Sequence, residues 1–393
     1  MSKRQLITLF ACSIIFFTNG NALMSLLPVY ITRLGGDPEA VGYYFSLAFA
    51  AVAVGTLLTG WLSDRYQRRK LMLILSGAAS VPLIWLMGQA TDIAQLTLFT
   101  VLNWFISGVY VSEINILAGL FATEDQRGRV FGLLSSAVAL GGLIGGLVSG
   151  PLVDRWGFSA LFTMATGLAI LLPTLGLLVQ DRFVPKTSVE PDGKPSQSFT
   201  LSLGFGLLFV ASVIAFITNA TGILARPLMM DTLQFDATTI TGTVAIGGLI
   251  GLPLPFLVGW LSDLIGRKSL LIICYVLNGL GLLVIVSAFA PWHFWLSAAF
   301  QFSMAASIAV GSALMTDLVP RGSLGVGLSL FTSTNPIGYV IGFAGTGIAM
   351  RQFDIPATLI LGVVLSVVSV LLLLPIRAGG RKQRVKEAPA AVA

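Results

Sequence analysis

Long apolar stretches, separated by short polar connections, run along almost the whole chain of 393 residues. A helix that spans a membrane needs about 20 mostly apolar residues, with charges kept to its ends. Twelve stretches meet this condition, at residues 6–31, 41–63, 71–89, 94–118, 128–150, 158–179, 200–226, 238–262, 268–290, 293–316, 323–348 and 354–376. The pattern therefore predicts an all-α membrane protein with twelve transmembrane helices.

One polar connection is longer than the others. Residues 180–199 contain three prolines, a glycine and charges of both signs, which is typical of a flexible linker. We therefore expect an N-terminal six-helix half at 1–179, a cytoplasmic linker at 180–199, a C-terminal six-helix half at 200–376 and a cytoplasmic tail at 377–393.

Basic residues are distributed unevenly among the connections. Of the 23 Lys and Arg residues, 19 lie in the termini and the even-numbered connections, and only Arg33, Arg155, Arg226 and Arg351 lie on the opposite side. Cytoplasmic loops carry the excess of Lys and Arg, so we expect both termini in the cytoplasm, with the protein in a bacterial plasma (inner) membrane. The net charge of +6 then reflects topology, and no nucleic-acid partner is expected.

The composition excludes several other classes of protein. Only 10% of the residues are charged and 55% are hydrophobic, whereas a soluble domain carries about a quarter charged residues. Cys12 and Cys274 both lie in apolar stretches and His293 is the only histidine, so neither a disulfide framework nor a metal site is predicted. Without a nucleotide-binding loop or a paired catalytic set, we expect no enzyme and no cofactor.

A short motif occurs twice. Gly60-Trp61-Leu62-Ser63-Asp64 is repeated as residues 259–263, 199 positions later. Thr18-Asn19 matches Thr218-Asn219, and Leu27-Pro28 is matched by Arg226-Pro227. Such an offset indicates an internal duplication. Two parallel six-helix halves, with a site near the middle of the membrane between them, are typical of a transporter.

The repeated motif resembles the hallmark of the major facilitator superfamily, Gly-x-Leu-x-Asp-Arg-x-Gly-Arg-Lys. Gln67 replaces the internal glycine in the first copy, and Gly266 keeps it in the second. The resemblance implies the twelve-helix fold and a cytoplasmic latch between the halves; the alternative is that the motif only fixes topology and tight turns. The latch residues would be Gly60, Asp64, Arg65, Arg68, Gly259, Asp263 and Arg267.

Two further stretches resemble parts of this superfamily. Residues 139–147 are similar to its antiporter motif, with Gly142 in place of the proline, although glycines at such spacing also serve close helix packing. The second half resembles the sugar efflux transporter subfamily at residues 208–212, Asn219, 227–228, 317–320 and 330–332. This second resemblance favours a sugar as the substrate.

Glu113 is the one acidic residue placed well inside a predicted span. An unpaired charge at the centre of a bilayer costs about 2.5–3.5 kcal/mol on insertion scales, so such residues usually face a cavity or a partner. Helical spacing puts it on one stripe with Asn103, Ile106, Tyr110 and Leu117. We expect this stripe to face the central cavity and Glu113 to couple transport to protons; the alternative is a structural ion pair with Arg127 or Arg129.

Arg226 is the other unusual charge, because it stands beside a helix-breaking proline where the first half has Leu27. It either binds substrate or closes an external gate, or else it reaches the outer interface and pairs with Asp231. Amide and hydroxyl groups suited to a sugar come from other spans. The complete set of cavity candidates is Asn21, Ser25, Asn103, Tyr110, Asn219, Arg226, Gln301 and Asn335.

These features predict a secondary active transporter that exports sugars or similar small polar solutes by alternating access, coupled to protons. Its partners would be the small-molecule substrate, protons and the lipid bilayer, and we expect a monomer. A multidrug or metabolite proton antiporter of the same superfamily is one alternative, and facilitated diffusion is another, because Asn103 stands where proton-coupled drug exporters usually carry an arginine. A non-transporting membrane sensor is the alternative from a different class.

Overall fold

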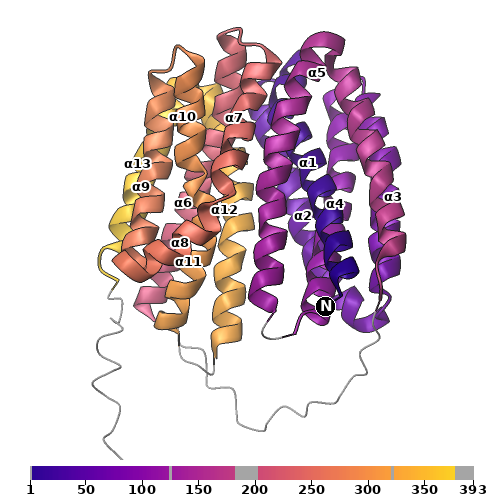
Figure 1. Ribbon diagram of the computed structural model, residues 1–393. Helices are drawn as coiled ribbons and strands as arrows, with labels where there is room; N and C mark the ends of the chain where they lie inside the picture. Colours follow the sequence, from indigo (N-terminus) through magenta and orange to yellow (C-terminus); the bar gives the residue numbers. More distant parts are fainter. Residues whose placement is uncertain (1, 124–125, 182–201, 320–322, 377–393) are drawn as a thin grey trace, which may run out of the picture.

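The computed structural model describes residues 2–123, 126–181, 202–319 and 323–376, which form a bundle of α-helices (Figure 1). The helices are α1 (Lys3–Arg33), α2 (Pro38–Tyr66), α3 (Arg69–Gly88), α4 (Ile93–Phe121), α5 (Arg127–Leu178), α6 (Leu203–Thr232), α7 (Ala237–Gly251), α8 (Leu254–Ile265), α9 (Arg267–Val286), α10 (Pro291–Gln301), α11 (Ser303–Leu318), α12 (Leu324–Phe353) and α13 (Ile355–Leu373). The predicted linker beyond residue 181 and the predicted tail at 377–393 lie outside the described residues.

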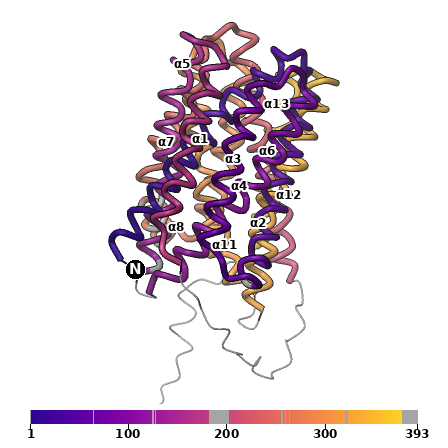
Figure 2. The backbone as a smooth tube through the Cα atoms, turned by 90° about the vertical axis from the view of Figure 1, so that its right-hand side faces the viewer, coloured from indigo at the N-terminus to yellow at the C-terminus, as the bar shows by residue number. Residues whose placement is uncertain are grey.

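The helices form two groups side by side. Helices α1–α5 make up the first half and α6–α13 the second (Figure 1), and in both the helices run between the same two ends of the molecule (Figure 2). Within the described residues, nine helical stretches are long and apolar enough to cross a membrane. One of them, α5, is two spans joined at Gly157, where φ is 75°. Three further spans are not counted among the nine: the second span of α5, helix α12, and the pair α7–α8. With these three the predicted twelve spans are confirmed.

Two predicted spans of the second half are interrupted. The span predicted at 238–262 consists of α7 and α8, which meet around Leu252-Pro253, and the span predicted at 293–316 consists of α10 and α11, which meet at Phe302. Pro253 has no N–H to donate to a continuing helix. The ring of Phe302 packs against Gly251, so the two interruptions face each other.

The same signals start the corresponding helices of both halves. Ser2 and Ser202 accept a hydrogen bond from a backbone N–H in the first turn of α1 and α6, and Asp37 and Asp236 do so for α2 and α7. A side-chain oxygen at this position satisfies one of the free N–H groups of a helix start. The internal repeat therefore extends to the helix caps.

Helix α5 holds the two halves together through closely packed glycines. Gly141 and Gly145 lie against the backbone of α1, and Gly146 lies against the backbone of α7 in the second half. Residues without a side chain let helix backbones approach closely in a membrane. This region is therefore a packing seam between α1, α5 and α7, as the packing interpretation of residues 139–147 expected.

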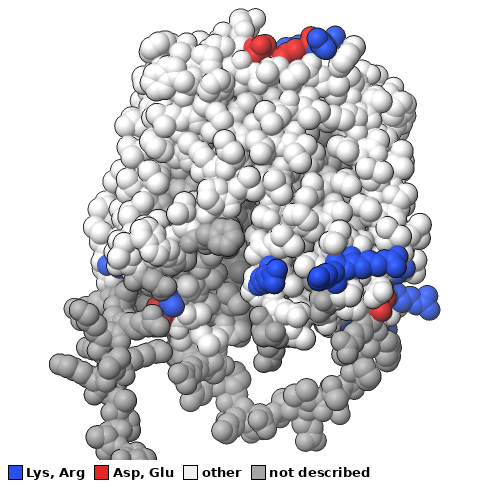
Figure 3. Space-filling view, viewed as in Figure 1, with Lys and Arg blue, Asp and Glu red and all other residues white. Residues whose placement is uncertain are grey.

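Charges are confined to the two ends of the molecule on the face seen in Figure 3. Lys and Arg gather at the end that carries the N-terminus, which we call the basic end. Residues of both signs are visible together at the opposite end. The apolar surface between them is the belt that lipid would cover.

Candidate substrate-binding cavity

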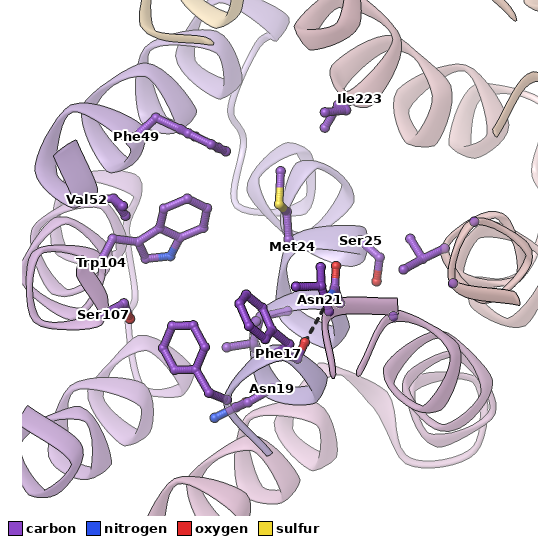
Figure 4. A pocket seen from close by; sticks show the side chains of 18 of the residues that line it. Phe17, Asn19, Asn21, Met24, Ser25, Phe49, Val52, Trp104, Ser107 and Ile223 are labelled. Carbon is purple, nitrogen blue, oxygen red and sulfur yellow. Dashed lines mark hydrogen bonds between the residues drawn. The ribbon is translucent and has the colours of Figure 1, made fainter. Parts of the chain in front are cut away.

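A cavity of about 660 Å³ lies between the two halves. Helices α1, α2, α4 and α5 of the first half and α6, α7, α10 and α12 of the second contribute to its wall. Figure 4 shows side chains of α1, among them Asn21 and Met24, across the open space from Phe49 and Trp104. Pockets for drug-sized ligands have volumes of about 300–1,000 Å³, so the cavity has the size for such a molecule.

Aromatic rings form one wall of this cavity. The ring of Phe49 lies 5.0 Å from that of Trp104 and 4.8 Å from that of Tyr339, centre to centre. Phe49 and Trp104 belong to the first half and Tyr339 to the second, so this aromatic cluster joins the halves. It offers an apolar surface to which both halves contribute.

Arg226 lies on the wall formed by α6 and is buried, with 9% of its surface exposed. Its Nη2 donates to Oε1 of Gln301 and, at 3.4 Å, to the hydroxyl of Ser297 on α10. Asp231 instead lies 3.9 Å from Arg33 of the first half. The interpretation in which Arg226 reaches the interface and pairs with Asp231 is therefore wrong.

Asn219, two turns earlier on α6, ties three helices of the second half together. Its Nδ2 donates to Oδ1 of Asn278 on α9 at 3.2 Å, and its Oδ1 accepts from the Tyr339 hydroxyl on α12 at 2.9 Å. Nδ2 of Asn278 in turn donates to the carbonyl of Ala215. Asn219 lines the cavity, but much of its hydrogen-bonding capacity already serves the packing of α6.

The structure brings most of the predicted cavity residues together and excludes two predicted positions. The lining includes Asn21, Ser25, Asn103, Asn219, Arg226, Gln301 and Asn335. Tyr110 is buried with its ring stacked on Phe16 of α1, and it is absent from the described lining. Glu113 is fully buried and is also absent from the described lining. Its role in proton coupling stays a prediction.

The misplaced residues share one cause. The residues of α4 that reach the cavity are Asn103, Trp104, Ser107 and Val111, whereas Tyr110 lies on the side packed against α1. In a helix bundle both sides of α4 are buried, so a polar stripe does not by itself identify the side that faces the cavity. The expectation that the stripe through Tyr110 and Glu113 faces the cavity is corrected accordingly.

Sequence reasoning did not single out Ser297, Asn278 or Phe302. Ser297 and Gln301 are four residues apart on α10 and therefore share one face, a signal that could have identified Ser297 as a partner of Arg226. The span formed by α10 and α11 is interrupted at Phe302, where the sequence has neither proline nor glycine. No local signal therefore predicts this interruption.

The predicted latch residues cluster at the basic end. Arg65 lies over the ring of Trp61, 5.6 Å from its centre, and Arg267 donates to Asp317 at 2.9 Å and to the Ala313 carbonyl at 2.8 Å. Gly60, Arg68 and Gly259 lie in the same end segments, while the side chains of Asp64 and Asp263 are outside the described part. A latch between the halves therefore stays a prediction.

The halves are joined instead at the opposite end. Both carboxylate oxygens of Asp154 accept from backbone N–H groups at the start of α7, from Ala237 and Thr238, each at 2.8 Å. Arg351 of α12 pairs with Glu39 of α2. Arg33 of α1 lies beside Asp231 of α6 at the same end, and the Ser46 hydroxyl of α2 donates to the Val340 carbonyl of α12. The conformation is thus closed there.

The fold, built from two related groups of helices around a cavity, is that of a multi-pass membrane transporter. The sequence profile of the Major Facilitator Superfamily matches residues 9–205 and again residues 207–392. The chain belongs to this superfamily. The predicted membership and the predicted fold class are confirmed.

Several curated relatives share a name. The chain is 28% identical over 278 residues to the multidrug resistance protein MdtG of Klebsiella pneumoniae (strain 342), and the match spans 65% of this chain and 65% of that relative. It is 27% identical over 286 residues to MdtG of Enterobacter lignolyticus (strain SCF1), across 69% of this chain and 67% of the relative.

Solved structures show the same fold at lower identity. The nucleoside transporter NupG superposes with a TM-score of 0.74 at 15% identity, covering 95% of this chain and 98% of NupG. A bacterial homologue of the human lysosomal transporter Spinster, inward-facing and unoccupied, has a TM-score of 0.74 at 16% identity, covering 95% and 97%. At such identities the likeness concerns the fold alone.

Proposed function

We propose that this protein exports small amphipathic molecules by alternating access, driven by protons. The observation that carries the proposal is the cavity of about 660 Å³ between the halves. It combines the aromatic cluster with amide groups, the mixture that drug-sized ligand sites commonly present. A site at the interface of two related halves can be exposed to either side of the membrane when the halves rock.

The distribution of charge supports an orientation. Basic residues mark the cytoplasmic side of membrane proteins, so we place the basic end in the cytoplasm of a bacterial plasma membrane, with both termini on that side. The contacts of Asp154 and Arg351 then close the outward side. In this arrangement the cavity takes up its cargo from the cytoplasm, as an exporter requires.

Two observations favour an amphipathic substrate over a sugar. The two curated relatives described above are multidrug resistance proteins, and Phe49, Trp104 and Phe302 give the cavity large apolar faces. The sugar hypothesis draws on the amides of Asn21, Asn219 and Asn335, and it stays a prediction that the same assay tests. Proton coupling through Glu113 is part of the proposal, because a buried carboxyl group in a span is a common site of proton transfer.

Counterflow in proteoliposomes tests the proposal. The probes are labelled aromatic anions, amides and cations, with labelled lactose beside them, and the key variant is Gly20→Leu. Gly20 lines the cavity, and a Cβ there would meet no atom within 4 Å, so we expect leucine to fill cavity space. Gly167→Leu is the matched control, because Gly167 also has open space around it but does not line the described cavity.

We expect counterflow of at least one aromatic probe, reduced severalfold in Gly20→Leu and unchanged in Gly167→Leu. Counterflow of lactose alone would replace the amphipathic substrate with a sugar. Binding of a probe without any counterflow would favour the non-transporting sensor.

A further inference from the structure

Arg226 is a buried cation inside a membrane span. An arginine at the centre of a spanning helix costs about 2.5–3.5 kcal/mol on insertion scales and usually faces a partner or a cavity. Arg226 faces the cavity, and the oxygens that accept from it belong to Gln301 and Ser297. Both partners are neutral, so the positive charge is solvated but not neutralised.

The acidic residues around the outer part of the second half have other partners. Asp231, one turn beyond Arg226 on α6, lies beside Arg33, and Glu39 pairs with Arg351. Asp154 binds the start of α7. Within the described part of the chain no carboxylate contacts Arg226, and Arg226 is the one charged side chain in the cavity lining.

Gln301 holds Arg226 in a fixed position. Its side chain lies between α6 and α9, where each helix has a glycine. A Cβ at Gly222 of α6 would overlap the Gln301 amide, and a Cβ at Gly281 of α9 would lie 2.7 Å from the Gln301 Cγ. The amide oxygen is occupied by Arg226. Nε2 of Gln301 and Nε of Arg226 are buried donors that have no hydrogen-bond partner among the described residues.

We propose that Arg226 and Gln301 form the binding site for the anionic group of an amphipathic organic anion, such as an aromatic carboxylate or sulfonate. The guanidinium of Arg226 is not neutralised, and its Nε and the neighbouring Nε2 of Gln301 are donors without a partner among the described residues. An acceptor with negative charge suits such donors best, since charge-assisted hydrogen bonds are the stronger ones. The aromatic cluster of Phe49, Trp104 and Tyr339 takes the apolar part. This inference rests on the proposed function and adds the charge of its substrate.

Three probes of nearly equal shape separate charge from shape: naphthalenesulfonate, naphthalenesulfonamide and trimethyl(naphthyl)ammonium. Their binding to the purified full-length protein is measured by isothermal titration calorimetry. We expect the sulfonate to bind about 10- to 100-fold more tightly than the amide, which is the usual range for a hydrogen bond to a charged group, and the cation to bind most weakly. Equal affinities, or a preference for the cation, would overturn the anion site.

Variants locate the effect. Arg226→Gln should remove the preference for the sulfonate, and Arg226→Lys, which keeps the charge, should retain it. Arg155→Gln is the matched control, because Arg155 is exposed at the end of the molecule over the ring of Trp156, and it should leave all three affinities unchanged. A preference that survives in a folded Arg226→Gln protein would contradict the proposal. If that variant does not fold, the three probes on the wild-type protein and on Arg226→Lys still decide.

Counterflow of the same probes distinguishes the two proposals. Selective binding of the sulfonate without counterflow would overturn the exporter and keep the anion site. Counterflow of the three probes at equal rates and equal affinities would keep the exporter and overturn the anion site.

Discussion

The two halves of the molecule agree in how their helices start and end but differ in the charge that each buries. In the first half, α4 carries Glu113, fully buried, and the position 199 residues later is Ser312. In the second half, α6 carries Arg226 beside Pro227. At the matching place α1 has Leu27 beside Pro28, and the Leu27 side chain is 1% exposed in the apolar core. Glu113 and Arg226 are therefore buried charged residues for which the matching position of the other half carries no charge.

The features that the two halves share serve the fold, whereas the buried charges in which they differ do not follow from the needs of the fold. The repeated caps at Ser2 and Ser202, and at Asp37 and Asp236, satisfy backbone groups that every helix start exposes. A charge buried in a membrane span costs free energy, and no helix start needs it. Positions where the repeat is broken by a charge are therefore the places to look for function, with Arg226 proposed for the substrate and Glu113 for the proton.

Glu113→Gln removes the buried charge of the first half and is expected to have the largest effect. Transport driven by an imposed proton gradient should fall to the rate seen without a gradient, because the amide cannot carry the proton, while counterflow persists. The measurement is uptake of the best-transported probe into proteoliposomes. Asp92→Asn on the same helix is the control, since asparagine caps a helix start as well as aspartate does. Full gradient stimulation in Glu113→Gln would assign Glu113 a structural role.

Leu27→Arg places an arginine in the first half at the position that matches Arg226, without the partners Gln301 and Ser297. Leu27 packs in the apolar core, so we expect the free energy of unfolding to fall by about 2.5–3.5 kcal/mol, measured by unfolding in a graded series of denaturing detergent. Leu27→Met keeps the volume and should cost less than about 1.5 kcal/mol. Equal stability of the two variants would show that α1 tolerates a charge as α6 does.

Gly222→Ala disturbs the support of Arg226 without touching it. The new Cβ overlaps the Gln301 amide, so Gln301 must move, at a cost of about 1–3 kcal/mol in unfolding free energy. The affinity of Gly222→Ala for naphthalenesulfonate should also fall, because Gln301 no longer holds Arg226 in place. Gly206→Ala on the same helix, where a Cβ meets nothing within 4 Å, is the control and should not lower either quantity. An unchanged affinity in Gly222→Ala would separate Gln301 from the anion site.

Lys70→Gln and Lys268→Gln probe a feature in which the halves agree, and the expected effect is the smallest. Nζ of Lys70 donates to the Leu177 carbonyl at the end of α5, and Nζ of Lys268 donates to the Leu374 and Ile376 carbonyls beyond α13. A cation at a helix C-terminus contributes about 0.3–1 kcal/mol, so each variant should lose that amount in the same detergent titration. Clearly unequal losses would show that the repeat does not extend to these contacts.

Much of the fold follows from hydropathy alone. The span predicted at 6–31 is α1 (Lys3–Arg33), and the span predicted at 71–89 is α3 (Arg69–Gly88), because apolar length is the property that a bilayer selects. The interruption of α7 and α8 had a local signal in Gly251 and Pro253. The interruption at Phe302 had none, since it depends on the packing of that ring against Gly251 of another helix.

The site was less accessible from sequence than the fold. Polar residues in spans are few, so listing them recovered Asn21, Gln301 and Arg226 of the cavity wall. Helical spacing could not tell which side of α4 faces the cavity, and Tyr110 was misplaced for that reason. The partnership of Arg226 with Ser297 and Gln301 joins helices far apart in the chain, and only the folded arrangement reveals it.

The grip of Asp154 on the start of α7 has a consequence for the rate of cycling. In the proposed transport cycle, each opening at the end where Asp154 lies must release two hydrogen bonds to backbone N–H groups. It also uncovers a helix start that its own cap, Asp236, satisfies only in part. A carrier without cargo has no new contact to offset that loss. In the proposed transport cycle we expect this carboxylate to set a free-energy threshold that restrains opening without substrate.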